Sequence, residues 1–358
     1  GDLVCRLGGD EFIVLLPLQE MVVEQADERA EKIARQITAA VKQPIKVGQH
    51  ELSAHMSIGI SHFTMTDGVE TIVTRSDNAM YLAKGDAASN IAFYTDAVHQ
   101  QLTHQMQVLE GIQEALVEDQ FFMHYQPQFN HLQELIGVEA LVRWQHSQLG
   151  LLLPDQFIGL AEQYHRINEI GSWVIDSVLS QVAQWHQAGY VLPKVAINIS
   201  PIQLLDENFT RVVDQLAERY GINPEGIVFE ITESTDIEHF NLISTVLEAL
   251  KARGYRFSLD DFGTGYASMT HFKRLPFSQV KIDQSFVADI ESNADSLAIA
   301  EVVLAMARSL KLEVIAEGVE TQSQLEILNK LGCTGYQGYL FSKPLSVQAI
   351  TSLLRRAD

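Results

Sequence analysis

The sequence predicts an α/β protein whose larger part is a (β/α)₈ barrel. From residue 121 to residue 358, short apolar segments alternate with longer segments of helical periodicity, and polar residues recur where the apolar segments end. Strands that alternate with helices are typical of α/β folds, and such a barrel builds its active site at the carboxyl ends of its strands. With 358 residues, the chain also has room for a second, smaller domain.

Residues 1–98 are expected to form part of a small α+β domain, which the chain enters in mid-fold. Segment 4–16 predicts two strands joined by a tight turn, because Gly8 and Gly9 supply the positive φ angles that such a hairpin needs. The later elements expected here are a helix at 20–42, a strand at 55–60, a helix at 76–84 with Ser76 as its N-cap, and a strand at 91–94.

Residues 99–120 predict a helical connection rather than a flexible linker. The segment has no Gly/Ser-rich stretch, and its apolar residues recur at steps of mostly three and four, which is one stripe of a helix. The stripe consists of Leu102, Met106, Leu109, Ile112 and Leu116. We hypothesise that this stiff segment transmits a twist between the two domains.

Residues 121–358 predict a TIM-like barrel whose first strand runs against the others. The strands at 121–128 and 135–144 are separated by a short polar turn, and so short a connection makes an antiparallel hairpin. Further strands are expected at 195–200, 227–232, 256–260, 279–282, 313–316 and 335–338. Helices are expected near 155–188, 207–220, 237–253, 294–310, 321–331 and 346–356, whereas segment 266–275 gives no clear pattern.

Acids and amides recur at the ends of these strands. The set is Glu139, Asn198, Glu230, Asp260, Asp261, Glu317, Glu320 and Gln337, with Lys281 inside its own strand. Packing does not explain the pattern, because burying an unpaired charge is costly. Carboxylates that face one another across a cation do explain it, and oxygen ligands select a hard ion such as Mg²⁺ or Mn²⁺. We therefore predict a metal site, although the adjacent acids Asp260 and Asp261, taken alone, fit a solvated turn equally well.

Composition excludes several classes of function. The net charge of −21 argues against a nucleic-acid polymer as partner, because such binding needs basic patches. It leaves room for a small phosphate substrate held through metal ions. Cys5 and Cys333 form no metal-binding motif, which fits a reducing compartment. No apolar run is long enough to span a bilayer, so a cytoplasmic location is expected for this portion, with an upstream sensor or membrane segment left open.

The first hairpin carries a family resemblance. Arg6-Leu7-Gly8-Gly9-Asp10-Glu11-Phe12 resembles the signature of GGDEF domains, the diguanylate cyclases. In that family the glycines approach GTP, while the acids at the positions of Asp10 and Glu11 serve metal binding and catalysis. The N-terminal half of such a domain is absent from this sequence, and Gly85-Asp86-Ala87 stands where the family has Gly-Arg-Asn. The resemblance therefore implies a vestigial or regulatory unit, with GTP as a partner only of an intact GGDEF domain.

The barrel carries a second and more specific resemblance. Glu139-Ala140-Leu141 looks like the signature of EAL domains, the cyclic di-GMP phosphodiesterases, and the likeness covers residues 105–358. It implies hydrolysis of cyclic di-GMP to linear pGpG at a site with two Mg²⁺ or Mn²⁺ ions, in a homodimer formed through this domain. Ala267 stands where the family often has Ser.

The resemblance also implies a role for each matching residue. Glu139, Asn198, Glu230 and Asp260 would hold one metal ion, and Asp260 would bridge to a second ion completed by Asp261. Lys281 would orient the attacking water, beside Glu317 as base or ligand, while Glu320 and Gln337 support these groups. Glu233 would anchor the 262–268 loop. Substrate contacts would come from Gln126, Arg143 and Pro344.

Other interpretations stay open at this point. Arg143 fits a surface ion pair, Gln337 a strand-end cap, and Glu320 an exposed helix start. Lys281 fits a salt-bridge partner inside the barrel, although a lysine within a barrel strand needs acids around it. For the whole chain, the main alternative is a receptor that binds cyclic di-GMP without hydrolysing it. A cyclase is disfavoured because half of that domain is missing.

Overall fold

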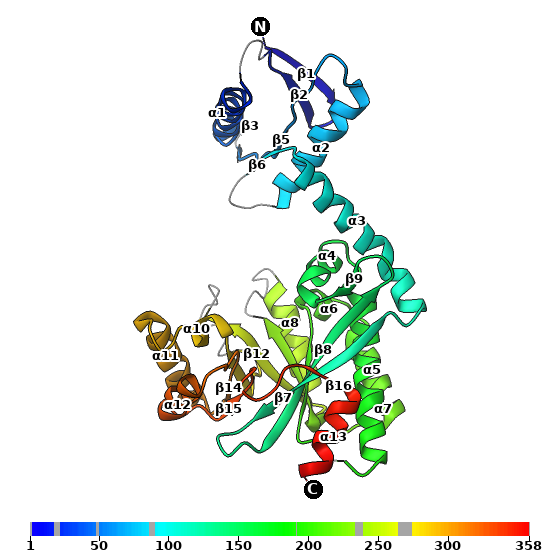
Figure 1. Cartoon of the computed structure of the whole chain (residues 1–358), viewed down its shortest axis with the longest axis vertical. Helices are drawn as coiled ribbons and strands as arrows, with labels where there is room; N and C mark the ends of the chain where they lie inside the picture. Colours follow the sequence, from blue (N-terminus) through cyan, green and yellow to red (C-terminus); the bar gives the residue numbers. More distant parts are fainter. Residues whose placement is uncertain are drawn as a thin grey trace. The chain divides into compact units, whose positions relative to one another are not determined.

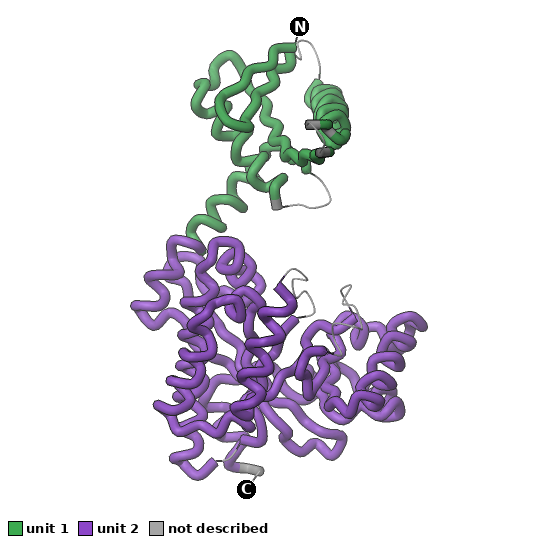
Figure 2. The backbone as a smooth tube through the Cα atoms, turned by 180° about the vertical axis from the view of Figure 1, so that it is seen from behind, with its two compact units in different colours: residues 1–108 green, residues 109–358 purple. Residues whose placement is uncertain are grey.

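The computed structural model of the chain describes residues 2–17, 22–47, 50–85, 90–190, 192–232, 239–263 and 274–357. The chain divides into two compact units, residues 1–108 and residues 109–358 (Figure 2). Helix α3 (Asp96–Val117) contains the boundary. The domain limits proposed from the sequence, at residues 98 and 120, remain predictions.

Unit 1 contains the predicted glycine hairpin. Strand β1 (Leu3–Gly8) pairs antiparallel with β2 (Glu11–Leu15), and Gly9 turns between them with a φ of +52°. The predicted strands near 58 and 91 are β5 (Ile58–Ile60) and β6 (Ile91–Phe93), which pair in parallel. A small hairpin of β3 (Ile45–Val47) and β4 (His50–Leu52) was not predicted.

The second helix of unit 1 begins earlier than the sequence predicts. Helix α1 (Val23–Val41) matches its predicted range, but α2 (Val69–Gly85) starts seven residues before Ser76. Ser76 is therefore inside the helix, and its hydroxyl donates to the Ile72 carbonyl oxygen at 3.1 Å. The N-cap prediction is wrong because a serine can satisfy its hydroxyl on the preceding helical turn as well as at a helix start.

Helix α3 covers most of the predicted connecting segment, and one residue of the predicted apolar stripe, Met106, is exposed. Leu102, Val108, Ile112 and Ala115 are buried, whereas Met106 is 61% exposed. Near its end α3 packs closely on β8 (Leu135–His146). A Cβ added at Gly111 would lie 3.0 Å from Trp144 and 2.8 Å from His146.

The strands of unit 2 close into a barrel (Figure 1). Its first strand, β7 (Phe121–Phe129), pairs antiparallel with β8 on one side and with β15 (Gly335–Tyr336) on the other. The remaining pairs of the ring are parallel. The strands between β8 and β15 are β10 (Val195–Asn198), β11 (Ile227–Thr232), β12 (Arg256–Phe262), β13 (Gln279–Ile282) and β14 (Glu313–Ala316). The predicted barrel with a reversed first strand is thus confirmed.

Helices cover the outside of the strands, and most lie where the sequence predicts them. They are α7 (Phe209–Tyr220), α8 (Phe240–Lys251), α11 (Ala294–Leu310), α12 (Gln322–Leu331) and α13 (Val347–Ala357). The single helix predicted at 155–188 is wrong. The chain forms a short 3-10 turn at Pro154–Gln156, then α4 (Ile158–Gln163) and α5 (Ile167–Gln187). Between α4 and α5, His165 adopts a left-handed φ of +56°.

Two further short strands and two short α-helices were not predicted. They are β9 (Gly150–Leu152), α6 (Pro201–Leu204), α10 (Gln284–Ala288) and β16 (Leu345–Ser346). Most of segment 266–275 lies outside the described residues. None of the described helices is long and apolar enough to cross a membrane.

Alternation along each strand separates the apolar core from the barrel interior. On β13, Val280 and Ile282 are buried in a cluster with Val303 and Leu304 of α11, while Lys281 between them points the other way. Successive side chains of a strand face opposite sides, so the helix-facing residues are apolar and the interior is free to hold polar groups. Each fully buried aliphatic side chain stabilises the fold by about 1.5–3 kcal/mol.

Candidate active site

Lys281 lies at the centre of the barrel's polar interior. Its side chain is 1% exposed, and its Nζ lies 2.7 Å from Glu317, 2.9 Å from Glu230, 3.1 Å from Asp260 and 3.5 Å from Glu139. One ammonium group therefore contacts four carboxylates. Lysine side chains are almost never fully buried unless acids pair with them. Each of the four acids here comes from a different segment of the barrel.

Strand register brings these side chains together. Asn198 of β10 lies beside Glu230 of β11, and Thr232 of β11 lies beside Asp260 of β12. Glu139 of β8 pairs across the hairpin with Gln126 of β7. The parallel strands all end at the same rim, so residues near those ends meet although they lie far apart in sequence.

Amides orient the carboxylate of Glu139. Asn198 Nδ2 donates to Oε1 at 2.6 Å, and Gln337 Nε2 donates to Oε2 at 2.5 Å. The same Gln337 nitrogen also lies 3.2 Å from Gln126 Oε1, and its own Oε1 accepts from Gln128 Nε2 at 2.9 Å. The sequence analysis missed Gln128. Its position two residues after Gln126, on the same face of β7, could have revealed it.

Burial and the neighbouring charges together raise the pKa of some acids in the cluster and lower that of another. Burial raises the pKa of Glu230 well above its usual range, and the neighbouring carboxylates add to that effect. Burial likewise raises the pKa of Glu317 to about 8. Burial alone would raise the pKa of Glu139 too, but Lys281 and the two amide donors outweigh it and hold that pKa below its usual value. Lys281 keeps its proton, because the four acids raise its pKa despite its burial.

Asp261 extends the acidic cluster toward the loop after β12. Burial, together with Asp260 and Asp283, raises the pKa of Asp261 to about 6. Its backbone has a left-handed φ of +55°, a conformation that aspartate tolerates better than most residues. This backbone turn lets two adjacent acids contribute to one cluster, which a regular strand would prevent.

The cluster fits a divalent cation. Asp260, Asp261 and Glu317 each offer an oxygen, and these oxygens all lie within 4.8 Å of one another. In addition, Glu230 Oε1 is buried without a hydrogen-bond partner. An all-oxygen set of this kind matches Mg²⁺ or Mn²⁺. A bound cation would favour the ionised acids whose pKa values burial raises.

The three predicted substrate contacts come from different segments. Arg143 of β8 is half-buried, and burial lowers its pKa while nearby Glu139, Tyr339 and Asp155 act in the opposite direction. Gln126 Nε2 donates to the Ser342 carbonyl oxygen at 3.2 Å, which joins β7 to the loop after β15. Pro344 is half-buried in the same loop.

One other predicted position, Glu320, does not join the described cluster. Glu320 is exposed before α12, and its backbone N–H donates to Gln324 Oε1 at 2.8 Å. The helix-start interpretation therefore describes Glu320 well, and its supporting role stays a prediction. Glu233 and Ala267 lie outside the described residues.

The hairpin residues Gly8, Gly9, Asp10 and Glu11 of unit 1 are exposed. Arg6 holds the turn, because its Nε donates to the Gly9 carbonyl oxygen at 3.0 Å.

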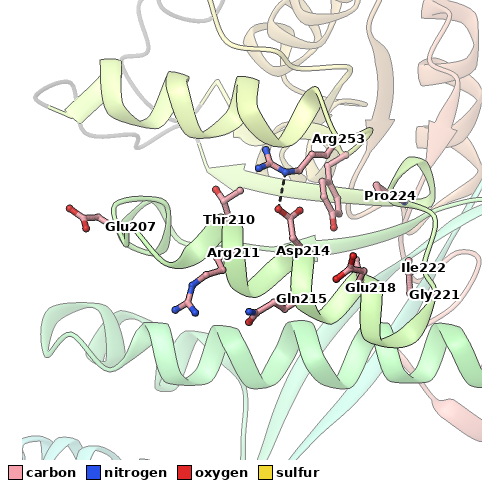
Figure 3. Close-up of a pocket in the computed structure, with 12 residues that line it drawn as sticks. Glu207, Thr210, Arg211, Asp214, Gln215, Glu218, Gly221, Ile222, Pro224 and Arg253 are labelled. Atoms are coloured by element: carbon pink, nitrogen blue, oxygen red, sulfur yellow. Dashed lines mark ion pairs between the residues drawn. The ribbon is translucent and has the colours of Figure 1, made fainter.

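A separate groove of about 840 Å³ lies along α7 (Figure 3). It runs past the turn at Gly221–Pro224, and Arg253 and Asp214 form an ion pair of 2.8 Å across it. None of the predicted site residues lines this groove.

A family comparison agrees with the geometry of unit 2. The model of the EAL domain family matches residues 109–344, which is more than half of the chain. The chain belongs to the EAL domain family. Residues 1–90 match the model described as "Diguanylate cyclase, GGDEF domain", so the EAL domain follows a partial GGDEF domain, as predicted.

Curated relatives share this tandem region. The chain is 36% identical over 352 residues to the "Bifunctional diguanylate cyclase/cyclic di-GMP phosphodiesterase MucR" of Pseudomonas aeruginosa, covering 98% of this chain and 50% of that protein. It is 34% identical to the "Cyclic di-GMP phosphodiesterase PdeR" of Escherichia coli, covering 99% of this chain and 52% of that protein. The EAL-containing chain thus spans about half the length of these relatives.

Solved EAL domains share the barrel. The structure described as "PaMucR Phosphodiesterase, c-di-GMP complex" matches with a TM-score of 0.65 and 38% identity. The match covers 68% of this chain and 99% of that one. An EAL domain of Mycobacterium smegmatis DcpA matches with a TM-score of 0.56 and 31% identity, over 66% of this chain and 96% of that one.

Proposed function

We propose that the barrel hydrolyses cyclic di-GMP to linear pGpG in a reaction that depends on Mg²⁺ or Mn²⁺. The observation that carries this proposal is the cluster of acids around Lys281, in which three carboxylates lie within 4.8 Å of one another. The relatives named as cyclic di-GMP phosphodiesterases, and the EAL structure described with c-di-GMP, support the choice of substrate.

The metal-binding roles follow from the donor atoms. Glu139, Asn198, Glu230 and Asp260 would hold one ion, and Asp260, Asp261 and Glu317 would hold a second. When bound, such ions lower the pKa of a water and neutralise charge on the phosphate. The amides of Asn198 and Gln337 fix the orientation of Glu139 in advance, which limits the reorganisation that metal binding requires.

Lys281 and Glu317 would handle the attacking water. Lys281 Nζ has three N–H donors and no acceptor, so it can position a water oxygen but cannot take its proton. Glu317, 2.7 Å away, is the candidate base or ligand. With its pKa at about 8, Glu317 holds a proton at neutral pH until a cation displaces that proton. Base chemistry at Glu317 therefore requires the loaded site.

Substrate binding would use the rim around Arg143. A guanidinium is suited to phosphate oxygens, because its fork of donors matches their geometry. Gln126 and Pro344 would contact the same ligand from β7 and from the loop after β15.

Unit 1 would regulate the barrel rather than make cyclic di-GMP. Its sequence lacks the Gly-Arg-Asn segment expected after Lys84. We also propose that the domains divide at residues 98 and 120 and that the barrel forms a homodimer. The proposed location is cytoplasmic.

The test is to incubate the purified chain with cyclic di-GMP and either Mg²⁺, Mn²⁺ or EDTA, and to follow pGpG by chromatography. We expect product with either metal ion and none with EDTA. Product formed equally in EDTA would refute the metal requirement. Tight binding without product under every condition would replace the enzyme by a receptor.

A further inference from the structure

A buried glutamine holds the loop that follows strand β10. Gln203 of α6 is 3% exposed, and its Oε1 accepts a hydrogen bond from the Ser200 backbone N–H at 3.0 Å. In return, the Ser200 hydroxyl accepts from the Ile202 backbone N–H at 3.2 Å. A serine and a glutamine three residues apart that bond in this way form a capping box, which fixes where a helix begins. Gln203 therefore sets the path of the backbone between β10 and α6.

Helix α5 confines the same glutamine. Gly171 is buried in α5, and a Cβ added there would overlap Gln203 Nε2 and lie 2.5 Å from its Cδ. Just beyond α6, Asp206 Oδ2 accepts from Asn168 Nδ2 of α5 at 3.3 Å. Only a glycine at position 171 leaves the amide of Gln203 the space that it occupies.

A proposed metal ligand stands at the start of this loop. Asn198 ends β10, two residues before Ser200, and its Nδ2 donates to Glu139 Oε1 at 2.6 Å. Asn198 itself is exposed, so packing around its side chain does not fix its amide. Where the amide points depends on the backbone that the capping box holds.

We propose that Gln203 is a positioning residue of the metal site, a role that rests on the proposed function. It holds the Ser200 backbone, and through it the orientation in which Asn198 reaches Glu139. Ser200 is 7% exposed, so removal of the Gln203 side chain leaves a buried N–H without its acceptor. An unsatisfied buried donor is costly, and the backbone shifts to regain a partner. Such a shift weakens metal binding, because it disturbs a ligand that is oriented in advance.

The experiment is calorimetric titration of the whole chain with Mg²⁺. Gln203→Ala is expected to weaken Mg²⁺ binding about tenfold, as is usual when a supporting hydrogen bond of a metal site is lost. Gly171→Ala should have the same effect, because its methyl group displaces the Gln203 amide without altering it chemically. The two changes break one interaction, so the double variant should bind Mg²⁺ within about twofold of either single variant.

Asn223→Ala is the matched control. Asn223 Oδ1 accepts from the Glu225 backbone N–H at 3.2 Å, at the start of the 3-10 turn Pro224–Gly226. This cap directly precedes β11, so it lies at the opposite rim of the barrel from the metal site. Asn223→Ala should lower the midpoint of urea denaturation, as Gln203→Ala should, while its Kd for Mg²⁺ stays within about twofold of the unmodified chain.

Turnover separates this inference from the proposed function. Gln203→Ala should need about tenfold more Mg²⁺ for half-maximal pGpG formation. An unmodified chain that binds Mg²⁺ and forms pGpG, together with a Gln203→Ala variant of unchanged Kd for Mg²⁺, would overturn the positioning role and leave the function standing. A double variant whose loss is the product of the two single losses would overturn the shared interaction. An unmodified chain that binds Mg²⁺ without forming pGpG would overturn the proposed function alone, and one that binds no Mg²⁺ would overturn both.

Discussion

At the scale of single residues, Lys281 controls the charge of the barrel interior. Replacing it by Met leaves its four acid neighbours without their buried cation. Removing one partner of a buried ion pair costs about 3–5 kcal/mol. We expect Lys281→Met to lose about 3 kcal/mol of unfolding free energy in EDTA at pH 7.5, measured by urea denaturation. The loss should shrink at pH 5.5, because protonated acids need no cation. A variant as stable at both pH values as Lys330→Met, which removes an exposed lysine from the last turn of α12, would contradict this assignment.

Glu139 tests the metal assignment at one position. We expect Glu139→Ala to reduce pGpG formation at least about a hundredfold, because it removes a proposed metal ligand that two amides hold in place. The variant should stay soluble and folded, since the change also relieves repulsion among neighbouring acids. Far-UV circular dichroism would check the fold. Turnover like that of the unmodified chain would refute the assignment.

The raised pKa values of two acids make metal binding depend on pH. Burial raises the pKa of Glu317 to about 8 and that of Asp261 to about 6, so the metal-free site holds protons that a cation must displace. Affinity for Mg²⁺ should therefore rise as pH increases from 6 to 8. Calorimetry at pH 7 in two buffers of different ionisation enthalpy should detect about one released proton per site. Heats that are independent of the buffer would contradict the prediction.

The raised pKa values of Asp261 and Glu317 also determine how the stability of the metal-free fold changes with pH. An acid whose pKa is higher in the folded than in the unfolded state favours folding below its unfolded pKa. That contribution is lost as pH rises through the folded pKa. Asp261 should therefore weaken the metal-free fold between about pH 4 and pH 6, and Glu317 should weaken it up to about pH 8.

At the scale of elements, the contact between α3 and β8 depends on a glycine. A Cβ at Gly111 would lie 2.8 Å from His146 Nε2 and 3.0 Å from the Trp144 ring. Overpacking of this kind costs about 1–3 kcal/mol and exceeds the gain in helix propensity of about 1 kcal/mol. We expect Gly111→Ala to lower the midpoint of urea denaturation. Gly159→Ala in α4, where nothing lies within 4 Å, should be neutral or stabilising. Equal behaviour of the two variants would contradict the packing argument.

The sequence predicts regular elements well and their interruptions poorly. Strands β11, β13 and β14 and helix α11 match their predicted ranges, because apolar periodicity records which face is buried. The break between α4 and α5 was missed, because no glycine or proline marks it and His165 itself takes the left-handed conformation. Helix α2 was started too late, because Ser76 resembles a cap in sequence and bonds backward in the structure. Such choices depend on packing, which periodicity does not record.

The candidate site shows the same division. The acids at the strand ends predicted the cluster, because a charged residue in an otherwise apolar strand can be recognised from the sequence alone. A lysine inside a barrel strand pointed to acids around it, but which four acids meet at Lys281 depends on side-chain packing across the barrel. Gln128 was missed although its position two residues after Gln126 places both side chains on the same face of β7.

At the scale of the whole molecule, unit 2 can be observed separately. The three tryptophans of the chain are Trp144, Trp173 and Trp185, and all lie within residues 109–358. Tryptophan fluorescence therefore reports on the unit with the proposed metal site. We expect Mg²⁺ at 100 times its Kd to stabilise this transition by about 2.7 kcal/mol relative to EDTA. Fluorescence transitions that coincide with and without Mg²⁺ would contradict a metal site in the barrel.

The reversed first strand decides at which rim of the barrel the chain enters from α3. Because β7 runs against its neighbours, its first residues lie at the rim where the parallel strands end, and Phe122 pairs there with Arg143. Helix α3 ends at Val117, four residues before β7 begins. In a barrel with a parallel first strand, the incoming chain would arrive at the opposite rim. In this chain α3 therefore leads into β7 at the rim that holds the proposed substrate contact Arg143, and not at the opposite rim.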